Sequence, residues 1–597
     1  MKTMHDLGRN HHLKRFGITL ILVALMAAIG GCAAGTPTSQ YTLTIFSTAG
    51  GSVTTPGEGT QIYGAGLGVN LVATPDASYI FVNWTGDTAT IGDANASSTF
   101  IIMNDNYSIT ANFAEEEPDN PFAGGSGTAA DPYKISNWHH LDNVRDYPDK
   151  YFILLNHLGT TSGGYADLAS ATANGGKGWE PIGTALLDET DREQSYIPLD
   201  PFTGSFDGRG YEIRDMFIDR LEEDFVGLFG AVYEEAIIKD IGVMDATVTG
   251  SLFVGALVGV NGGKVNNSYA TGSVAGNDGV GTLVGVNAGT VDNCYATGSV
   301  AGNDGVGGLV GGNVGTLDNS YATGIVTGRD VVGSLVGANV GTMSDCYATG
   351  RVTGRDVVGG LAGANVGTMS DCYAAGRVTG ETSVGGLVGF NEGNVSHCYT
   401  IGEVTGRDVV GGLFGTNVGT MSGCYATGRV TGETSVGGLV GANVEDGAVS
   451  DCYATGEVTG RDLVGGLTGG NEGTVSNSYA TGSVAGNLGV GGLVGFNEGN
   501  VSHSYAAGSV TGDDGAGGLV GFSEGTVENS FWDIETSGQA TSDGGTGKTT
   551  VEMQNIATFE GAGWDICAVD LGDTDDGYTW NIVDGQTYPF LSWEPVS

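Results

Sequence analysis

The chain of 597 residues has few basic residues and few prolines: 22 Lys and Arg stand against 68 Asp and Glu, and only 12 residues are proline. The resulting formal charge of −46 disfavours nucleic acid and anionic membrane surfaces as partners. The scarcity of proline excludes a collagen-like chain, and 40% hydrophobic residues exclude general disorder. Glycine is nevertheless abundant, with 109 residues. A glycine-rich chain that is neither collagenous nor disordered indicates a repeat array.

A basic and then apolar leader opens the sequence. The apolar run Ile18–Ile29 is too short to span a bilayer as a helix and has the layout of a secretory signal. It ends in Gly30-Gly31-Cys32, which resembles the lipobox of prokaryotic lipoproteins. This resemblance implies a signal peptide over residues 1–31, lipidation of Cys32 and a short tether over residues 32–40. Ordinary signal cleavage nearby, with Cys32 incidental, is the alternative; both predict a protein that works outside the cytoplasm.

Residues 41–114 show short alternating segments separated by Gly, Pro, Asn and Asp, a pattern typical of β-strands joined by turns. The expected strands are Thr42–Phe46, Gly68–Ala73, Tyr79–Trp84, Ser98–Met103 and Tyr107–Phe113. The stretch resembles the extracellular bacterial modules related to the internalin B-repeat, through Gly50-Gly51-Ser52-Val53, Val72-Ala73-Thr74-Pro75 and Phe81-Val82-Asn83-Trp84. This resemblance implies a small β-grasp-like spacer with no chemistry attached, and residues 115–125 follow as a linker.

Residues 126–225 are less regular, and we interpret them as the region that begins the array and caps one end of its core. Ser136 can cap a short helix that runs to about Tyr147. A strand is expected at Tyr151–Asn156 and a hairpin at Phe202–Tyr211.

The motif Gly-x-Leu-x-Gly recurs through the second half of the chain with a period of 26 residues. One step of 28 is explained by two extra residues in the loop 443–447. There is no helical periodicity, and Gly or Thr occurs every few positions, so helical repeats are excluded. The pattern predicts an all-β fold: a parallel β-helix or solenoid of about twelve coils over residues 226–531, followed by a C-terminal cap over residues 532–597. The recurring leucines are residues 257, 283, 309, 335, 361, 387, 413, 439, 467, 493 and 519.

The repeat resembles the GLUG family, whose name records its glycine-leucine-any-glycine core. The end of the chain is similar to the usual end of such proteins, in Ser530-Phe531-Trp532-Asp533 and Tyr588-Pro589-Phe590-Leu591. Related arrays occur in surface adhesin-like proteins and beside the catalytic domains of IgA-specific metallopeptidases. The resemblance therefore implies surface display, and no activity by itself.

In a stacked solenoid each position of the repeat forms a column, and the columns predict their own environments. The Leu column and an apolar column from Val265 to Val527 are expected in the core. An Asn column from Asn261 to Asn497, closed by Ser523, is expected to stabilise a turn, because Asn tolerates the left-handed conformation and its amide can bond the copies above and below.

Cysteine and charge are also confined to columns. A column that alternates with Ser predicts buried free thiols, since parallel side chains give a poor disulfide torsion; its cysteines are Cys294, Cys346, Cys372, Cys398, Cys424 and Cys452. Two charged columns place opposite charges on adjacent coils and predict a solvated face that keeps the coils aligned, or alternatively a ligand-binding strip. They are Arg329, Arg355, Glu381, Arg407, Glu433 and Arg461, and Arg351, Arg377, Glu403, Arg429 and Glu457.

A tyrosine column runs from Tyr269 to Tyr505 and ends at Phe531. Strand alternation places Cys and Ala on one side and Tyr on the other, so an inward Cys makes the tyrosines an outer aromatic stripe. Such a stripe could stack on sugar rings. Stacking between coils that only stabilises the solenoid is the alternative. The candidate ligand-contact residues are Tyr347, Tyr373, Tyr399, Tyr425 and Tyr453.

We find no catalytic or metal-binding motif. His-Glu-x-x-His is absent, so the zinc chemistry of some relatives has no residues to carry it. The run Gly544–Thr549 imitates a phosphate loop, but Ser542 stands where its first glycine belongs. The acidic run Asp573–Gly577 could bind calcium only weakly, because it lacks the ligand spacing of a helix-loop-helix site.

These observations predict a secreted, lipid-anchored, non-enzymatic cell-surface protein without a cofactor, in which the solenoid serves adhesion or surface structure. Glycans or other surface proteins are its expected partners, the membrane is reached through the lipid anchor, and nucleic acid is not a partner. The alternatives are a carbohydrate-active β-helix enzyme, which would need clustered acids and bases on adjacent coils, and a glycan-binding accessory module.

Overall fold

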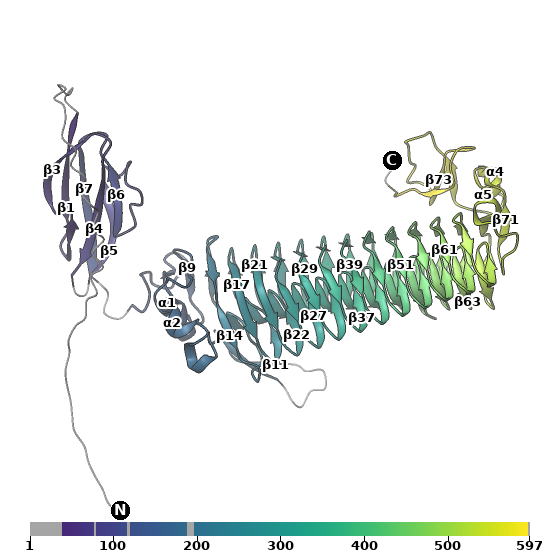
Figure 1. Ribbon diagram of the computed structural model, residues 1–597, viewed down its shortest axis with the longest axis horizontal. Coiled ribbons are helices and arrows are strands. Elements are labelled where there is room, and N and C mark those ends of the chain that lie inside the picture. The colour runs from purple at the N-terminus through teal and green to yellow at the C-terminus, as the bar shows by residue number, and fades with distance from the viewer. Residues whose placement is uncertain (1–38, 77–78, 116–119, 188–195, 595–597) are drawn as a thin grey trace, which may run out of the picture. The chain divides into compact units, whose positions relative to one another are not determined.

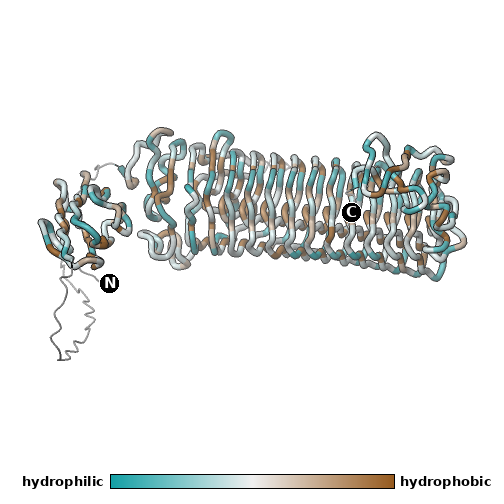
Figure 2. Tube along the Cα trace, turned by 90° about the horizontal axis from the view of Figure 1, so that it is seen from above, coloured by the Kyte–Doolittle hydropathy of each residue, from teal (hydrophilic) through white to brown (hydrophobic). Residues whose placement is uncertain are grey.

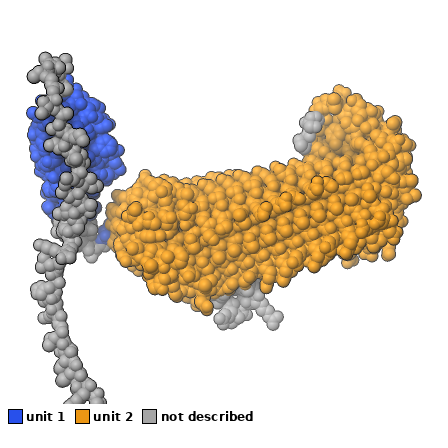
Figure 3. Space-filling view, viewed as in Figure 1, with its two compact units in different colours: residues 1–120 blue, residues 121–597 orange. Residues whose placement is uncertain are grey.

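The computed structural model describes residues 39–594 apart from 77–78, 116–119 and 188–195. The chain divides into two compact units, residues 1–120 and residues 121–597 (Figure 3). The predicted signal peptide and Cys32 lie outside the described residues. None of the helices in the described part of the chain combines the length and the apolarity that a membrane span requires.

Unit 1 is a small β domain of two sheets, with strand orders β3-β1-β7-β5 and β2-β4-β6. Its core contains Leu43, Leu71, Trp84 and Ile109. All five expected strands are present; β2 and β3 were not expected, because glycine and proline interrupt their sequence. The strands are β1 (Gln40–Ser47), β2 (Gly51–Thr55), β3 (Gly59–Gly64), β4 (Gly68–Pro75), β5 (Tyr79–Gly86), β6 (Ser98–Ile102) and β7 (Tyr107–Glu115).

The first residues of unit 2 form incomplete coils and a helical cap. Helix α1 (Trp138–Asp142) starts one residue later than expected, because the side chain of Asn137 rather than Ser136 accepts the capping bond from the His140 amide. A 3₁₀ turn, η1 (Asn143–Asp146), continues it. Trp138 is fully buried, so the cap closes the apolar interior of the solenoid.

The prediction of a hairpin at Phe202–Tyr211 is wrong. Strand β12 (Ser205–Asp207) pairs in parallel with β9 (Tyr151–Leu154) on one side and with β16 (Ile237–Lys239) on the other. The glycine-rich turn after β12 leads the chain round a corner into another sheet instead of back along the same strand. This region is therefore already part of the solenoid.

Most of unit 2 is a β-solenoid in which successive coils stack along one axis (Figure 1). Twelve equivalent strands stack in the sheet that runs from β15 (Phe229–Val232) to β68 (Val520–Ser523), which confirms twelve coils. The paired residues are 26 apart along the chain, as in Tyr321 and Tyr347, and the pairing is parallel and in register. One complete coil contains β33 (Val336–Asn339), β34 (Thr342–Ser344), β35 (Tyr347–Ala348), β36 (Arg351–Thr353) and β37 (Asp356–Gly359).

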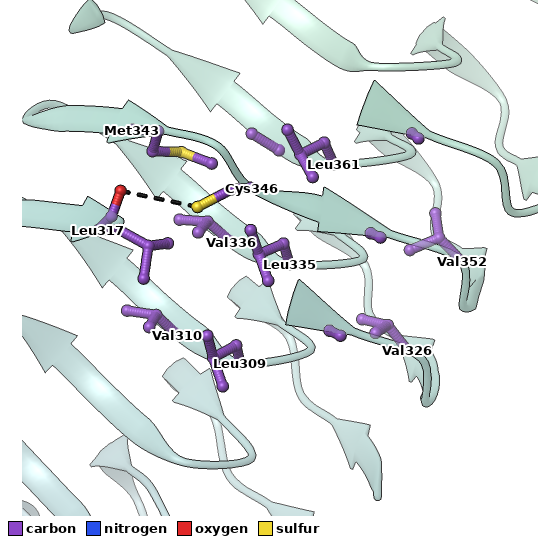
Figure 4. Close-up of a cluster of buried hydrophobic side chains, with 14 of the residues drawn as sticks. Leu309, Val310, Leu317, Val326, Leu335, Val336, Met343, Cys346, Val352 and Leu361 are labelled. Carbon is purple, nitrogen blue, oxygen red and sulfur yellow. Dashed lines mark hydrogen bonds between the residues drawn. The ribbon is translucent and has the colours of Figure 1, made fainter. Parts of the chain in front are cut away.

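The core of the solenoid is built from the predicted columns, and apolar residues recur at matching places in successive coils (Figure 2). The Leu column is fully buried, and so are the six column cysteines, which are free thiols. Figure 4 shows Cys346 beside Leu335 and Met343, with its Sγ 3.6 Å from the carbonyl oxygen of Leu317. Burial raises the pKa of Cys294 to about 12, so this thiol stays protonated.

The Asn column is a buried hydrogen-bonded ladder, as predicted. From Asn261 to Asn471, each Nδ2 donates to the Oδ1 of the next Asn at 2.7–2.9 Å. The expectation that this column adopts left-handed backbone is wrong, because none of its asparagines has a positive φ. Positive φ falls instead in two other columns, as at Asp345 (φ 52°) and Val331 (φ 53°). The amide ladder holds the turn through its side chains, so these asparagines need no unusual backbone.

The charged columns behave differently from one another. In the second column Arg429 bonds Glu457 of the next coil at 2.7 Å, and Arg377 bonds Glu403 likewise, as expected. In the first column each Arg bonds the Asp that follows it in sequence, with its Nε 2.9–3.0 Å from that carboxylate, and Arg355 also bonds Asp330 of the preceding coil. Asp408, with which Arg407 forms its ion pair, raises the pKa of Arg407 most, and Glu381 and Glu433 of the adjacent coils raise it further, as opposite charges on facing coils should. All these pairs are solvent-exposed and contribute little to stability.

Candidate functional site: the tyrosine ladder

The most distinctive outer feature of the solenoid is the tyrosine ladder, the column Tyr269, Tyr295, Tyr321, Tyr347, Tyr373, Tyr399, Tyr425, Tyr453, Tyr479 and Tyr505 with Phe531 at its end. Its residues lie on short strands such as β35, where Ala348 within the strand and Cys346 just before it are fully buried. The prediction that Cys and Ala point inward and Tyr outward is confirmed.

Consecutive rings of the ladder stack on one another. Their centroids are 4.7–5.1 Å apart and their planes differ by at most 10°. This follows from the in-register parallel pairing, which places each Tyr directly beside the next. Each ring face is therefore covered by a neighbouring ring, and the ladder presents ring edges and hydroxyl groups to solvent. Sugar rings normally stack on an aromatic face, so this geometry disfavours the expected stacking mode.

The five candidate residues divide into two environments. Tyr347, Tyr373, Tyr399 and Tyr425 are half-buried, whereas Tyr453 is only 8% exposed and does not belong to an open stripe. We call Tyr295–Tyr425 the open ladder and Tyr453–Phe531 the covered ladder. The hydroxyl groups of the open ladder form no hydrogen bond within the described residues, so they are available to solvent or a partner.

The C-terminal region covers part of the ladder, which the sequence did not predict. Only its first part closes the end of the solenoid: β71 (Thr546–Lys548) adds a final strand beside β70 (Phe531–Asp533). Residues 550–594, which we call the C-terminal cover, fold back along the flank of the last coils (Figures 1 and 3). The cover contains α4 (Thr550–Met553), α5 (Ile556–Glu560), β72 (Ile566–Ala568), β73 (Trp580–Ile582) and β74 (Phe590–Leu591).

The cover contacts the ladder through aromatic rings, and two of its tryptophans each contact two neighbouring tyrosines. Trp593 lies 6.3 Å from Tyr425 and 5.7 Å from Tyr453, between ring centroids. Trp580 lies 6.1 Å from Tyr479 and 6.0 Å from Tyr505. The concentration of tryptophan in this tail was the one sequence signal for a docked segment, because three of the seven tryptophans lie within it.

Hydroxyl groups of the covered ladder donate to acceptors in the cover. Tyr479 Oη donates to Glu594 Oε2 at 2.8 Å, and Tyr505 Oη donates to the carbonyl oxygen of Pro589 at 2.7 Å. Burial raises the pKa of Glu594 to about 7, although the amide of Leu591 and the Tyr479 hydroxyl both donate to it. Burial also raises the pKa of Tyr479 and Tyr505, and the nearby Glu594 adds to this effect.

The first ring of the ladder is also bonded. Tyr269 Oη donates to Glu212 Oε1 at 2.6 Å, and Arg214 pairs with the same carboxyl group. The ladder is thus closed at its start by a polar cluster and along its end by the cover. The stretch between them carries the free hydroxyl groups.

The remaining sequence candidates form no site within the described residues. The run resembling a phosphate loop provides β71, a strand paired with β70, rather than a loop. In the acidic run, Asp575 Oδ1 accepts from the amide of Gly577 at 2.9 Å. Across the described part of the chain, no group of three or more His, Cys, Asp or Glu residues is arranged to hold a metal ion.

The fold and its columns define a GLUG-type β-solenoid carried with a small β domain. Family models agree: the divergent InlB B-repeat domain matches residues 41–117, and the GLUG motif matches residues 329–353, 432–459, 460–485 and 486–511. The chain therefore carries a divergent InlB B-repeat domain and GLUG repeats.

Two curated proteins are similar to about a quarter of this chain. The "Putative Gly-rich membrane protein" of Evansella cellulosilytica is 37% identical over 151 residues, which cover 24% of this chain and 15% of that protein. The "Halomucin" of Haloquadratum walsbyi is 34% identical over 157 residues, 25% of this chain and 2% of that protein. This chain thus matches only a small part of each relative's length.

A solved structure, described as a putative immunoglobulin A1 protease from Bacteroides ovatus, is 21% identical. It covers 52% of this chain and 80% of its own, with a TM-score of 0.32. A score this low does not establish a shared fold.

Proposed function

We propose that this protein is a non-enzymatic cell-surface protein whose solenoid serves adhesion or surface structure, and that a lipid on Cys32 anchors it. The observation that carries this proposal is the uniformity of the outer columns. A catalytic site is a local departure from a repeat, whereas the outward residues of the described coils recur from coil to coil. The name of the Evansella relative, a membrane protein, and the similarity to Halomucin support a location at the cell surface.

A carbohydrate-active enzyme is the competing function, and the geometry favours it less. Glycoside hydrolysis needs two carboxyl groups that flank one bond. The nearest candidates on the solenoid are the aspartates after the column arginines, and these carboxylates are already engaged in ion pairs. A glycan-binding module remains compatible with the open ladder, through hydroxyl groups and ring edges rather than ring faces.

Surface display and anchoring can be tested in cells. Metabolic labelling with an alkyne fatty acid should label the wild-type chain and fail for Cys32→Ala, and external protease should cleave the solenoid of intact cells. Unlabelled wild-type protein would contradict the lipid anchor. In parallel, the chain from residue 33 should release no product from polysaccharides; product release would contradict the non-enzymatic assignment.

A further inference from the structure

The C-terminal cover shows which chemical groups bind to the tyrosine ladder. The same column of stacked rings continues without interruption from the open ladder into the covered ladder. In the covered part, a polypeptide segment of this chain supplies aromatic rings to the tyrosines and oxygen acceptors to the hydroxyl groups of Tyr479 and Tyr505. The open part has the same rings, the same spacing and unused hydroxyl groups.

We propose that the open ladder is a docking surface for an aromatic, carboxylate-bearing polypeptide segment of a partner protein, which binds as the C-terminal cover does. This inference deepens the proposed adhesive function, on which it rests, by naming the chemistry of the partner. The open ladder is continuous with an interface that the chain already makes, and the two tyrosines that Trp593 joins lie on the boundary between them.

The spacing of the ladder sets the spacing of the partner's rings. Trp593 and Trp580 of the cover each contact two tyrosines, and two coils advance the solenoid by about 10 Å. Continued in the same register beyond Trp593, the next aromatic rings of a partner would meet Tyr373 with Tyr399, and then Tyr321 with Tyr347. The partner segment should therefore present large aromatic side chains at intervals of about 10 Å on one face.

One arginine beside the open ladder offers a charge partner to a carboxylate. Four residues after the Tyr, the open coils carry in turn Ser299, Ile325, Arg351, Arg377, Glu403 and Arg429, and the covered coils carry Glu457, Ser483 and Ser509. Arg377 and Arg429 pair with the Glu of the next coil. Arg351 is exposed and has no ion pair within the described residues. A carboxylate on the partner could pair with this arginine or, like Glu594, accept from a tyrosine hydroxyl group.

The mode of binding distinguishes this partner from a glycan. Stacking between neighbouring tyrosines blocks the ring faces that a sugar would need. The tryptophans of the cover avoid this obstacle because they approach the ladder from its outer edge, at 24–52° to the tyrosine planes. A peptide can make this contact and place a carbonyl oxygen beside each hydroxyl group.

The test uses the full mature chain and, as probe, a dye-labelled peptide of residues 578–594, which contains the two tryptophans of the cover that contact ladder tyrosines. Fluorescence anisotropy should detect binding to the wild type. The double variant Tyr373→Ser with Tyr399→Ser should weaken binding by roughly tenfold or more, because it removes one two-tyrosine contact. The matched control, Val340→Ser with Val366→Ser, changes exposed residues on another face, in the coil of Tyr373 and the coil before it, and should bind as the wild type does.

A conservative variant guards against misfolding. Tyr373→Phe with Tyr399→Phe keeps both rings and the stacking, and should weaken binding by about threefold through loss of the hydroxyl donors. Failure of the peptide to bind the folded wild type, or equal binding to all variants, would overturn the proposal. A glycan, or a second copy of the chain, whose binding is lost in the Tyr→Ser variant would also overturn it by identifying a different occupant. These measurements in solution are independent of the labelling and protease assays of surface display.

Discussion

Glu594 should make the attachment of the C-terminal cover dependent on pH. This carboxyl group lies between the cover and the ladder, where Tyr453, Tyr479 and Tyr505 surround it, and burial raises its pKa from 4.5 to about 7. The folded state therefore binds this proton more tightly than the detached state does. The attachment is most stable below pH 4.5, weakens as pH rises to about 7, and changes no further above that value.

The size of the effect follows from the shift in pKa. A rise from 4.5 to about 7 corresponds to roughly 3 kcal/mol between the protonated and ionised forms. Glu594→Gln removes the buried charge, while its amide can still accept from Leu591 and donate to the oxygen of Tyr479. The variant should thus hold the cover more firmly at pH 8 by up to about 3 kcal/mol, and should differ little from the wild type at pH 4.5.

Hydrogen exchange measured by mass spectrometry over residues 580–594 can check this prediction, because it reports local detachment without global unfolding. Protection factors, corrected for intrinsic exchange, should fall between pH 5 and pH 8 in the wild type and stay nearly constant in Glu594→Gln. Glu560→Gln, at an exposed position of the same cover, is the matched control and should follow the wild type. An equal fall in Glu594→Gln and wild type would refute the reasoning.

Three further predictions concern the coils themselves. Asn391→Ala should lower the free energy of urea unfolding of the array by about 2–4 kcal/mol, because it removes the ladder partner of the buried amide groups on both neighbouring coils. The control, Asn394→Ala at an exposed position, should change this free energy by under about 0.5 kcal/mol. Val409→Ser should stabilise the array by about 1 kcal/mol in the same assay, because the new hydroxyl group can donate to a glycine carbonyl oxygen. Serines at the same left-handed position on both adjacent coils already do so. An unchanged urea midpoint would contradict this prediction. Ellman's reagent at pH 8 should react with the partly exposed Cys567 in the native chain and with the six buried column cysteines only after denaturation.

The repeat made the solenoid predictable from sequence. A column such as Leu309, Leu335 and Leu361 predicts burial strongly, because equivalent residues of stacked coils have the same environment and burial of one implies burial of all. Alternation within a single strand was then enough to place Tyr347 outside and Cys346 inside.

Predictions from local sequence failed where contacts with distant parts of the chain determine the structure. The tolerance of Asn for left-handed backbone pointed to the wrong column, since the buried amide ladder uses Asn for its hydrogen bonds while Val331 takes the positive φ. The C-terminal cover was missed because it contains no repeat and its contacts span long separations, as between Tyr479 and Glu594, 115 residues apart. No local pattern can report such a contact.

The C-terminal cover also has a mechanical consequence. In a solenoid each coil contacts only its neighbours, so an array normally loses coils one at a time from an end. Residues 550–594 contact coils from Tyr425 to Phe531 at once, and these last coils cannot separate until the whole cover has detached. Under a pulling force, the last coils and the cover should therefore unfold together as one unit, whereas the coils before them should unfold one after another.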